Sequence, residues 1–206
     1  MSTRWERIAR ETAGEDYARE YAERFRALAA SGADVHGEAA LVASLVPAPA
    51  RVLDAGCGTG RIAVRLRELG YDVVGVDVDV AMLWVAAADS PGLDWRWADL
   101  STLDLGSTFD LVLVAGNTIP LLEEATLADS CARIAAHIAP GGLVICGFGL
   151  DEAHLPRGCP VTSLTEFQAA MATAGLDDVI EFSGWDRSAF DPAGGYVVSV
   201  HQRPEE

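Results

Sequence analysis

The feature that most constrains the fold is a regular alternation, from residue 51 to residue 175, of short apolar runs with amphipathic segments. The apolar runs have the length of buried strands, and residues 109–114 are apolar at nearly every position. The segments between them repeat apolar residues at helical spacing and end at glycine or proline. This pattern predicts an α/β fold in which helices connect the strands of a doubly wound, largely parallel sheet.

The expected elements follow from the same periodicities. The predicted strands are 51–53, 72–76, 93–97, 109–114 and 143–148, followed by a closing hairpin of 179–185 and 196–201. Four helices are predicted by their ranges, namely 15–30, 37–46, 79–88 and 163–174. Two more are predicted by their apolar faces, one with Ile62, Leu66 and Leu69 and one with Leu127, Cys131, Ile134 and Ile138. No repeat or long linker divides the 206 residues, so we expect one domain with a small N-terminal appendage.

Composition excludes several classes of function. All 15 basic residues are arginine, so no lysine is present to form a Schiff base or to serve a phosphate-binding loop. The net charge of -16 repels nucleic acid and anionic membrane surfaces, and no apolar run approaches the ~20 residues of a membrane span. Four cysteines without a CxxC pair, and a beginning without the apolar stretch of a signal peptide, favour a reduced, cytoplasmic setting.

The densest chemical signal is the segment 52–61, VLDAGCGTGR, directly after the first predicted strand. Its glycines follow the spacing GxGxG, whereas a dinucleotide-binding turn follows GxGxxG. Asp54 precedes these glycines, where a carboxylate suits a positively charged ligand better than a pyrophosphate. Asp77 ends the second strand, 21 residues after Gly56, where its carboxylate can bind two ribose hydroxyls. A third acid, Asp99, ends the third strand.

With these motifs in order, the sequence resembles the class I S-adenosylmethionine-dependent methyltransferases. The matching segments are DAGCGTG at 54–60, VGVDVD at 74–79, ADL at 98–100 and FDLVLVAGN at 109–117, and the resemblance spans roughly residues 36–203. It implies a Rossmann-like sheet of seven strands with the last one antiparallel. It also implies S-adenosylmethionine as cofactor and S-adenosylhomocysteine as product.

The resemblance implies a role for each matching position. Gly56, Gly58 and Gly60 would let the backbone approach the methionine part of the cofactor, with Asp54 organising the turn near its ammonium group. Asp77 would bind the ribose and Asp99 the adenine amino group, while 115–117 would face the sulfonium. The alternatives are that Asp99 is an ordinary turn residue and that Asn117 is a helix cap. The complete expected cofactor set is Asp54, Gly56, Cys57, Gly58, Gly60, Asp77, Val78, Asp99, Leu100, Ala115 and Asn117.

Residues 1–35 are expected to form a helical lid on a cofactor-binding domain of residues 36–206. Residues 1–31 are charge-balanced, with six arginines and six acids, and Tyr17, Tyr21, Phe25 and Leu28 form one stripe. Tyr17 and Tyr21 could cover the sulfonium by cation–π contact, or could be ordinary core-facing residues. His36 could contact a ligand or simply lie at a helix start. The spacing of histidines and cysteines fits no zinc site, so no metal is expected.

The expected function is in-line methyl transfer to a small-molecule acceptor, by a monomer or homodimer, without an identifiable catalytic base. The glycine spacing disfavours a nicotinamide-dependent oxidoreductase. An aminopropyltransferase would carry tandem aspartates where Ala115, Gly116 and Asn117 stand. A non-catalytic cofactor-binding sensor or partner subunit stays open. The acceptor is not indicated, because residues 117–125 and 149–162 carry no recognisable signature.

Overall fold

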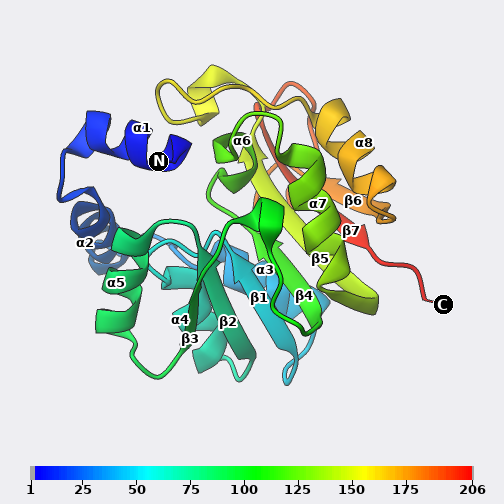
Figure 1. Cartoon of the computed structure of the whole chain (residues 1–206), viewed down its shortest axis with the longest axis horizontal. Coiled ribbons are helices and arrows are strands. Elements are labelled where there is room, and N and C mark those ends of the chain that lie inside the picture. Colours follow the sequence, from blue (N-terminus) through cyan, green and yellow to red (C-terminus); the bar gives the residue numbers. More distant parts are fainter. Residues whose placement is uncertain (1–2, 206) are drawn as a thin grey trace.

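The computed structural model describes residues 3–205. Residues 1, 2 and 206, which belong to the expected lid and domain ranges, lie outside the described residues. Within this range the chain forms a central sheet flanked by helices on both faces, with two further helices beyond one end of the strands (Figure 1).

The sheet has seven strands in the order β3-β2-β1-β4-β5-β7-β6. Strands β1 to β4 pair in parallel with their neighbours and with β5, whereas β7 runs antiparallel to both β5 and β6. This confirms the expected doubly wound sheet with its last strand antiparallel. The strands are β1 (Arg51–Ala55), β2 (Asp72–Asp77), β3 (Asp94–Trp97), β4 (Phe109–Val114), β5 (Ile138–Gly149), β6 (Asp177–Phe182) and β7 (Tyr196–Gln202).

The helices include two that the apolar periodicity did not predict, α1 and the short α6. The expected helical face 127–138 is wrong at its end, because α7 stops at Ala136 and Ile138 already pairs with Phe109 as the first residue of β5. The α-helices are α1 (Arg4–Ala13), α2 (Tyr17–Ala30), α3 (Gly37–Leu45), α4 (Arg61–Glu68), α5 (Val80–Asp89), α6 (Thr118–Leu121), α7 (Leu127–Ala136) and α8 (Leu164–Thr173), and the 3-10 helices are η1 (Leu100–Thr102) and η2 (Glu152–His154).

Two apolar cores cover the two faces of the sheet. Alternate residues of β4 point to opposite faces, so that Val112 and Val114 join one core and Leu111 and Leu113 the other. The first core packs the sheet against α7 and α8, and the second packs it against α3 and α4. All four of these β4 side chains are completely buried, which explains why this strand reads as a continuous apolar run.

Helices α1 and α2 belong to neither of these cores. They pack on α5 through a small separate cluster that contains Ala9, Tyr17, Ala18 and Met82. In Figure 1 they lie beyond the upper ends of the strands, with α2 beside α5 and α1 extending toward α6. This places the N-terminal segment over the carboxyl ends of the strands, where α/β sheets bind ligands.

Candidate functional site

A cavity of about 740 Å³ lies between the carboxyl ends of the strands and the N-terminal helices. This volume is in the range of small-molecule and cofactor sites. Its floor is formed by the segments that follow β1, β2, β3 and β4, and its roof by α1 and α2. The predicted site residues that line it are Gly56, Cys57, Gly58, Asp77, Val78, Asp99, Leu100, Ala115, Asn117, Tyr17 and Tyr21.

The glycine-rich turn is folded tightly over the end of β2. The N–H groups of Gly56 and Cys57 both donate to the carbonyl of Val76, at 2.8 and 2.9 Å. Gly56 has a φ of 83°, and a Cβ at this position would lie 2.4 Å from Oγ1 of Thr118. Glycine is therefore required at position 56 by both backbone conformation and space, and the turn leaves backbone exposed toward the cavity.

Asp77 joins the turn to the second strand. Its Oδ2 accepts from the Gly58 N–H at 2.7 Å, and its Oδ1 accepts from the Asp79 N–H at 2.8 Å. Burial raises the pKa of Asp77 to about 6, although these backbone donors favour the charged form. Each carboxylate oxygen retains a lone pair, so Asp77 can also accept hydrogen bonds from ligand hydroxyls.

Two members of the predicted cofactor set do not line the cavity. Gly60 lies under Trp95, and a Cβ there would be 2.4 Å from the indole ring. Asp54 is 1% exposed, and neither carboxylate oxygen has a hydrogen-bond partner among the described residues. Burial raises the pKa of Asp54 to about 7, against the opposing effect of Arg61. Gly60 therefore provides room for packing, and Asp54 is a buried carboxylate directly behind the turn.

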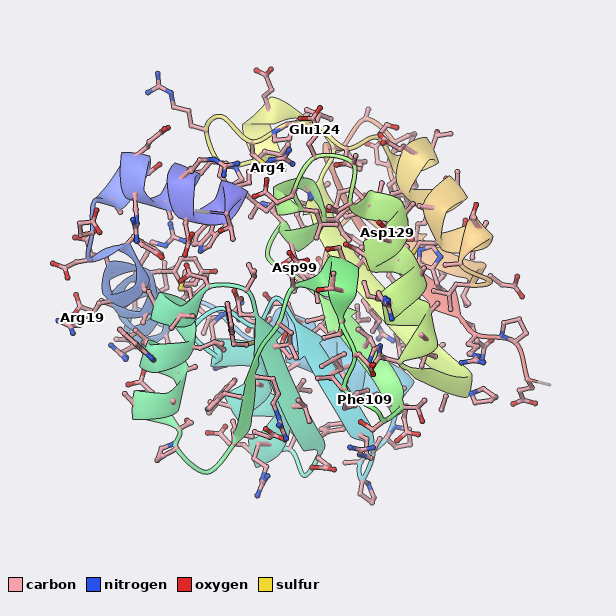
Figure 2. The ribbon with its side chains drawn as sticks, in the orientation of Figure 1. Arg4, Arg19, Asp99, Phe109, Glu124 and Asp129 are labelled. Atoms are coloured by element: carbon pink, nitrogen blue, oxygen red, sulfur yellow. The ribbon has the colours of Figure 1, made fainter. Side chains whose placement is uncertain are left out.

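Asp99 and Asn117 each have a structural partner as well as a place at the cavity. Oδ1 of Asp99 accepts from the N–H and the hydroxyl of Ser101, both at 2.8 Å, and so begins η1 (Figure 2). The Asn117 side chain accepts from the Gly149 N–H at 2.7 Å and donates to the carbonyl of His154 at 3.1 Å. Asn117 thus fixes the segment after β5, and its side chain still keeps one N–H and one oxygen lone pair for a ligand, as Asp99 keeps its second oxygen.

The two predicted lid tyrosines differ in their environment. Tyr17 is 3% exposed, and its hydroxyl donates to Asp79 at 2.7 Å. Tyr21 is partly exposed, and its ring meets Trp5 edge-on with the centroids 6.1 Å apart. Burial raises the pKa of both phenols, so both carry their protons near neutral pH. Both residues pack in a core cluster and also line the cavity, and their contact with a sulfonium stays a prediction.

The periodicity missed α1 and Trp5, which line the cavity together with Ile8 and Ala9. A local signal for this helix is present in the sequence. The side chain of Thr3 accepts from the Glu6 N–H, and the Glu6 carboxylate accepts from the Thr3 N–H. This reciprocal pair is the capping box that an S/T-x-x-E segment predicts at the start of a helix.

The cavity wall near α4 is held by Arg61. Its guanidinium forms hydrogen bonds with Glu38, at 2.6 and 3.1 Å, and with the carbonyl of Val35. It also lies 4.5 Å from the ring centroid of Phe25 on α2. Arg61 therefore connects the helix after the glycine turn to both α3 and α2. His36, at the start of α3, is not among the residues that line the cavity.

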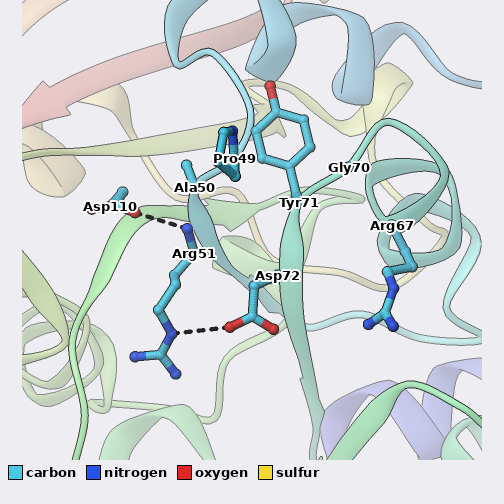
Figure 3. A pocket seen from close by; sticks show the side chains of 8 residues that line it. All are labelled: Pro49, Ala50, Arg51, Arg67, Gly70, Tyr71, Asp72 and Asp110. Atoms are coloured by element: carbon cyan, nitrogen blue, oxygen red, sulfur yellow. Dashed lines mark hydrogen bonds and ion pairs between the residues drawn. The ribbon is translucent and has the colours of Figure 1, made fainter.

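A second depression, of about 420 Å³, lies at the opposite end of the sheet (Figure 3). Arg51 lines it, and its backbone N–H lies 2.7 Å from Asp110 and its Nε 3.2 Å from Asp72. These residues are at the amino ends of β1, β2 and β4, away from the glycine turn. Because ligands in this architecture bind at carboxyl ends, we take the cavity under α1 and α2 as the candidate functional site.

Residues 3–205 contain neither a metal-binding cluster nor a membrane-spanning helix. No group of three histidine, cysteine, aspartate or glutamate residues in this range is arranged to hold a metal ion. None of the helices in this range is long and apolar enough to cross a membrane.

Comparison with protein families places this site in context. A family model described as a methyltransferase domain matches residues 52–142, from β1 to the start of β5. Among curated proteins, the chain is 30% identical over 135 residues to dTDP-4-amino-2,3,4,6-tetradeoxy-D-glucose N,N-dimethyltransferase of Saccharopolyspora spinosa, covering 63% of this chain and 54% of that protein. The chain covers between 38% and 54% of the length of the first curated relatives it matches.

Solved structures match over nearly the whole chain. A TehB-like SAM-dependent methyltransferase from Corynebacterium glutamicum is 34% identical, with a TM-score of 0.81, over 91% of this chain and 98% of that chain. The SAM-bound amino pentose methyltransferase of Micromonospora echinaspora is 25% identical, with a TM-score of 0.67, over 90% of this chain and 96% of that chain. The chain belongs to the S-adenosylmethionine-dependent methyltransferases.

Proposed function

We propose that the chain binds S-adenosylmethionine in the cavity of about 740 Å³ and transfers its methyl group to a small-molecule acceptor. The observation that carries this proposal is the convergence of the glycine turn, Asp77 and Asp99 on one cavity roofed by α1 and α2. A lone glycine turn is a common strand–helix connection, whereas a glycine turn with Asp77 and Asp99 at the next two strand ends around one cavity is the arrangement that a nucleoside ligand needs.

The residues of this chain fit such a cofactor. Asp77 would accept from the ribose hydroxyls while its backbone hydrogen bonds hold it in place. The free Asp99 oxygen would accept from the adenine amino group. Asp54, buried without a hydrogen-bond partner among residues 3–205, favours a positively charged group beyond the turn. Bound S-adenosylmethionine would supply the activated methyl group and its own leaving group, so no covalent intermediate on the protein is needed.

The acceptor would bind at the end of the cavity formed by α1, α6 and the segment after η2. This part is lined by apolar side chains, namely Trp5, Ile8, Ala9, Leu121, Leu122 and Pro156, with Arg157 and Glu123 beside them. An apolar, roofed compartment excludes water from the transferring methyl group and holds donor and acceptor in line. The protein would thus contribute alignment rather than acid–base chemistry.

The direct test is binding followed by turnover. Calorimetry with S-adenosylmethionine and S-adenosylhomocysteine should show one site per chain, and NAD should not compete. A first acceptor panel of amino sugars and amino acids is suggested by relatives whose names specify amine substrates, such as glycine N-methyltransferase of Rattus norvegicus. Labelled methyl incorporation from metabolite extracts extends the panel.

The outcomes of this test separate the possible functions. S-adenosylhomocysteine formed only when an acceptor is present supports the proposal. Cofactor binding with no product from any extract would favour a sensor or partner subunit instead. Binding of NAD in place of S-adenosylmethionine would refute the proposed cofactor.

A further inference from the structure

Asp79 stands out as a buried carboxylate with four donors. It is completely buried at the start of α5, two residues beyond Asp77. Its Oδ1 accepts from the Ala81 N–H at 2.8 Å and the Met82 N–H at 3.4 Å, which caps the helix. Its Oδ2 serves a different purpose, since it accepts from Nε1 of Trp5 at 2.9 Å and from the Tyr17 hydroxyl at 2.7 Å.

These last two donors come from different helices of the roof. Trp5 is on α1 and Tyr17 begins α2, and their rings meet edge-on with the centroids 6.3 Å apart. One carboxylate oxygen therefore holds both roof helices against the segment between β2 and α5. Hydrogen bonds to a buried charge are the strong ones, because the carboxylate has no water to replace a lost donor.

The opposite side of α1 is also held. The Arg4 backbone N–H donates to Glu123, and its guanidinium donates to the carbonyls of Leu122 and, at 3.1 Å, Pro120. Figure 2 shows Arg4 at the end of α1 that faces α6. The first turn of α1 is thus attached on one side to Asp79 and on the other to the α6 segment, and both attachments hold it at the cavity.

Asp79 is also connected directly to the cofactor site. Its N–H donates to Oδ1 of Asp77, whose Oδ2 accepts from the Gly58 N–H. A continuous series of hydrogen bonds therefore runs from the glycine turn through Asp77 and Asp79 to the roof helices. A shift of Asp77 on binding a ribose would therefore act on α1 and α2 through Asp79 alone.

We propose that Asp79 is a positioning residue that latches α1 and α2 over the cavity, and that opening of this latch limits the exchange of cofactor and product. The proposal rests on the proposed function only for the identity of the ligand. Asp79 touches no reacting atom, and its effect passes through Trp5 and Tyr17, which line the cavity.

The test uses the full chain, and its three single aromatic variants each keep an aromatic ring. Trp5→Phe and Tyr17→Phe remove one latch donor apiece. Tyr71→Phe is the matched control, because Tyr71 is also 3% exposed and its hydroxyl donates to the Val46 carbonyl at 2.6 Å, at the far end of the sheet. The readouts are the dissociation rate of radiolabelled S-adenosylhomocysteine and the hydrogen exchange of amides in α1 and α2.

We expect Tyr17→Phe and Trp5→Phe to accelerate dissociation by roughly tenfold or more, the effect of losing a hydrogen bond to a buried carboxylate. Exchange should accelerate in α1 and α2 while amides of β4 and α7 keep their protection. Tyr71→Phe should leave both readouts at wild-type values. Asp79→Asn can retain the cap of α5 but places an amide against the two donors. Its dissociation rate and its exchange in α1 and α2 should match those of the combined Trp5→Phe/Tyr17→Phe variant.

Wild-type dissociation rates and roof protection in both latch variants would overturn the proposal. So would an equal acceleration in Tyr71→Phe, because the effect would then be general destabilisation. If the wild-type chain binds no S-adenosylhomocysteine, the proposed function fails, while exchange in the unliganded protein still tests the latch.

Discussion

Asp77 has two tasks that a single carboxylate can perform at once. It ties the glycine turn to the start of α5 through two backbone N–H groups, and it faces the cavity where a ribose would bind. The two tasks support each other, because the backbone donors fix the side chain in the orientation that a ligand needs. A residue with fixed geometry loses little entropy when its ligand arrives.

Replacing Asp77 by alanine should therefore weaken cofactor binding by about 2–4 kcal/mol, or roughly 30- to 700-fold, since charge-assisted hydrogen bonds to the ribose are lost. Calorimetric titration with S-adenosylhomocysteine measures this directly. Asp77→Asn, which keeps one oxygen for the turn, should lose less. An unchanged affinity in the alanine variant would remove Asp77 from the ribose site.

Asp54 should make stability depend on pH. Its folded pKa of about 7 exceeds the usual 3.8. The folded protein therefore retains a proton through the window between these values that the unfolded chain has released. This contribution is fully present below about pH 4 and is lost as the pH rises through about 7, with a magnitude of up to roughly 4 kcal/mol.

In Asp54→Asn, the fall in unfolding free energy between about pH 5 and about pH 8 should be smaller than in the wild type. Urea unfolding at both pH values measures it. Asp77 contributes to the same trend in both proteins, so only the difference between them reports on Asp54. Identical slopes would show that Asp54 keeps its ordinary pKa.

At the scale of elements, the roof and the body are separable. The two large cores contain no residue before Ala39, whereas α1 and α2 bury their side chains in the small cluster on α5. Deleting residues 1–31 should leave a folded protein with modestly lower cofactor affinity. Methyl transfer should fall much further, because the apolar roof over the acceptor is gone.

Circular dichroism and cofactor titration of the truncated chain check the first part, and product formation with an identified acceptor checks the second. Full transfer rates after truncation would show that residues 1–31 form only a structural or dimer-forming face.

Local patterns predicted most elements but not their long-range partners. The apolar run of β4 and the helical pattern of α8 are properties of neighbouring residues, and both elements were predicted. The pairing of Trp5 and Tyr17 with Asp79 joins positions more than 60 residues apart, and no periodicity encodes it. The prediction that Leu69 belongs to the buried face of α4 was wrong. Ile62 and Leu66 are buried, whereas Leu69 lies beyond the end of the helix and is 37% exposed.

At the scale of the whole molecule, the order of the sheet brings the separate motifs together. Adjacent strands β3, β2, β1 and β4 end at one edge, so acids far apart in sequence line one cavity. This convergence could be predicted from strand order alone. Motif spacing does not contain the tertiary packing of these residues. It therefore could not predict that Gly60 makes room for Trp95 or that Asn117 forms hydrogen bonds with the segment after β5.

The buried acids also predict how binding of a cationic ligand responds to pH. The pKa values of about 7 for Asp54 and about 6 for Asp77 leave both partly protonated near pH 6. A ligand with an ammonium and a sulfonium group favours the ionised forms, so binding should release protons, and affinity should rise as the pH increases through this window.

Calorimetry at about pH 6, in buffers of different ionisation enthalpy, measures the released protons. At about pH 8 the release should shrink toward zero. A binding enthalpy at pH 6 that does not depend on the buffer would contradict the prediction.

The attachment of Arg4 to the α6 side of the cavity has a practical consequence for handling the protein. Anything fused ahead of this residue would lie at the rim of the cavity, where it could block the proposed acceptor site or displace α1 and α2. The carboxyl end of the chain follows the end of β7, where Gln202 pairs with Leu143, at the edge of the sheet opposite the cavity (Figure 1). Purification tags and surface immobilisation should therefore be placed after residue 205, so that the tag does not alter the measured kinetics.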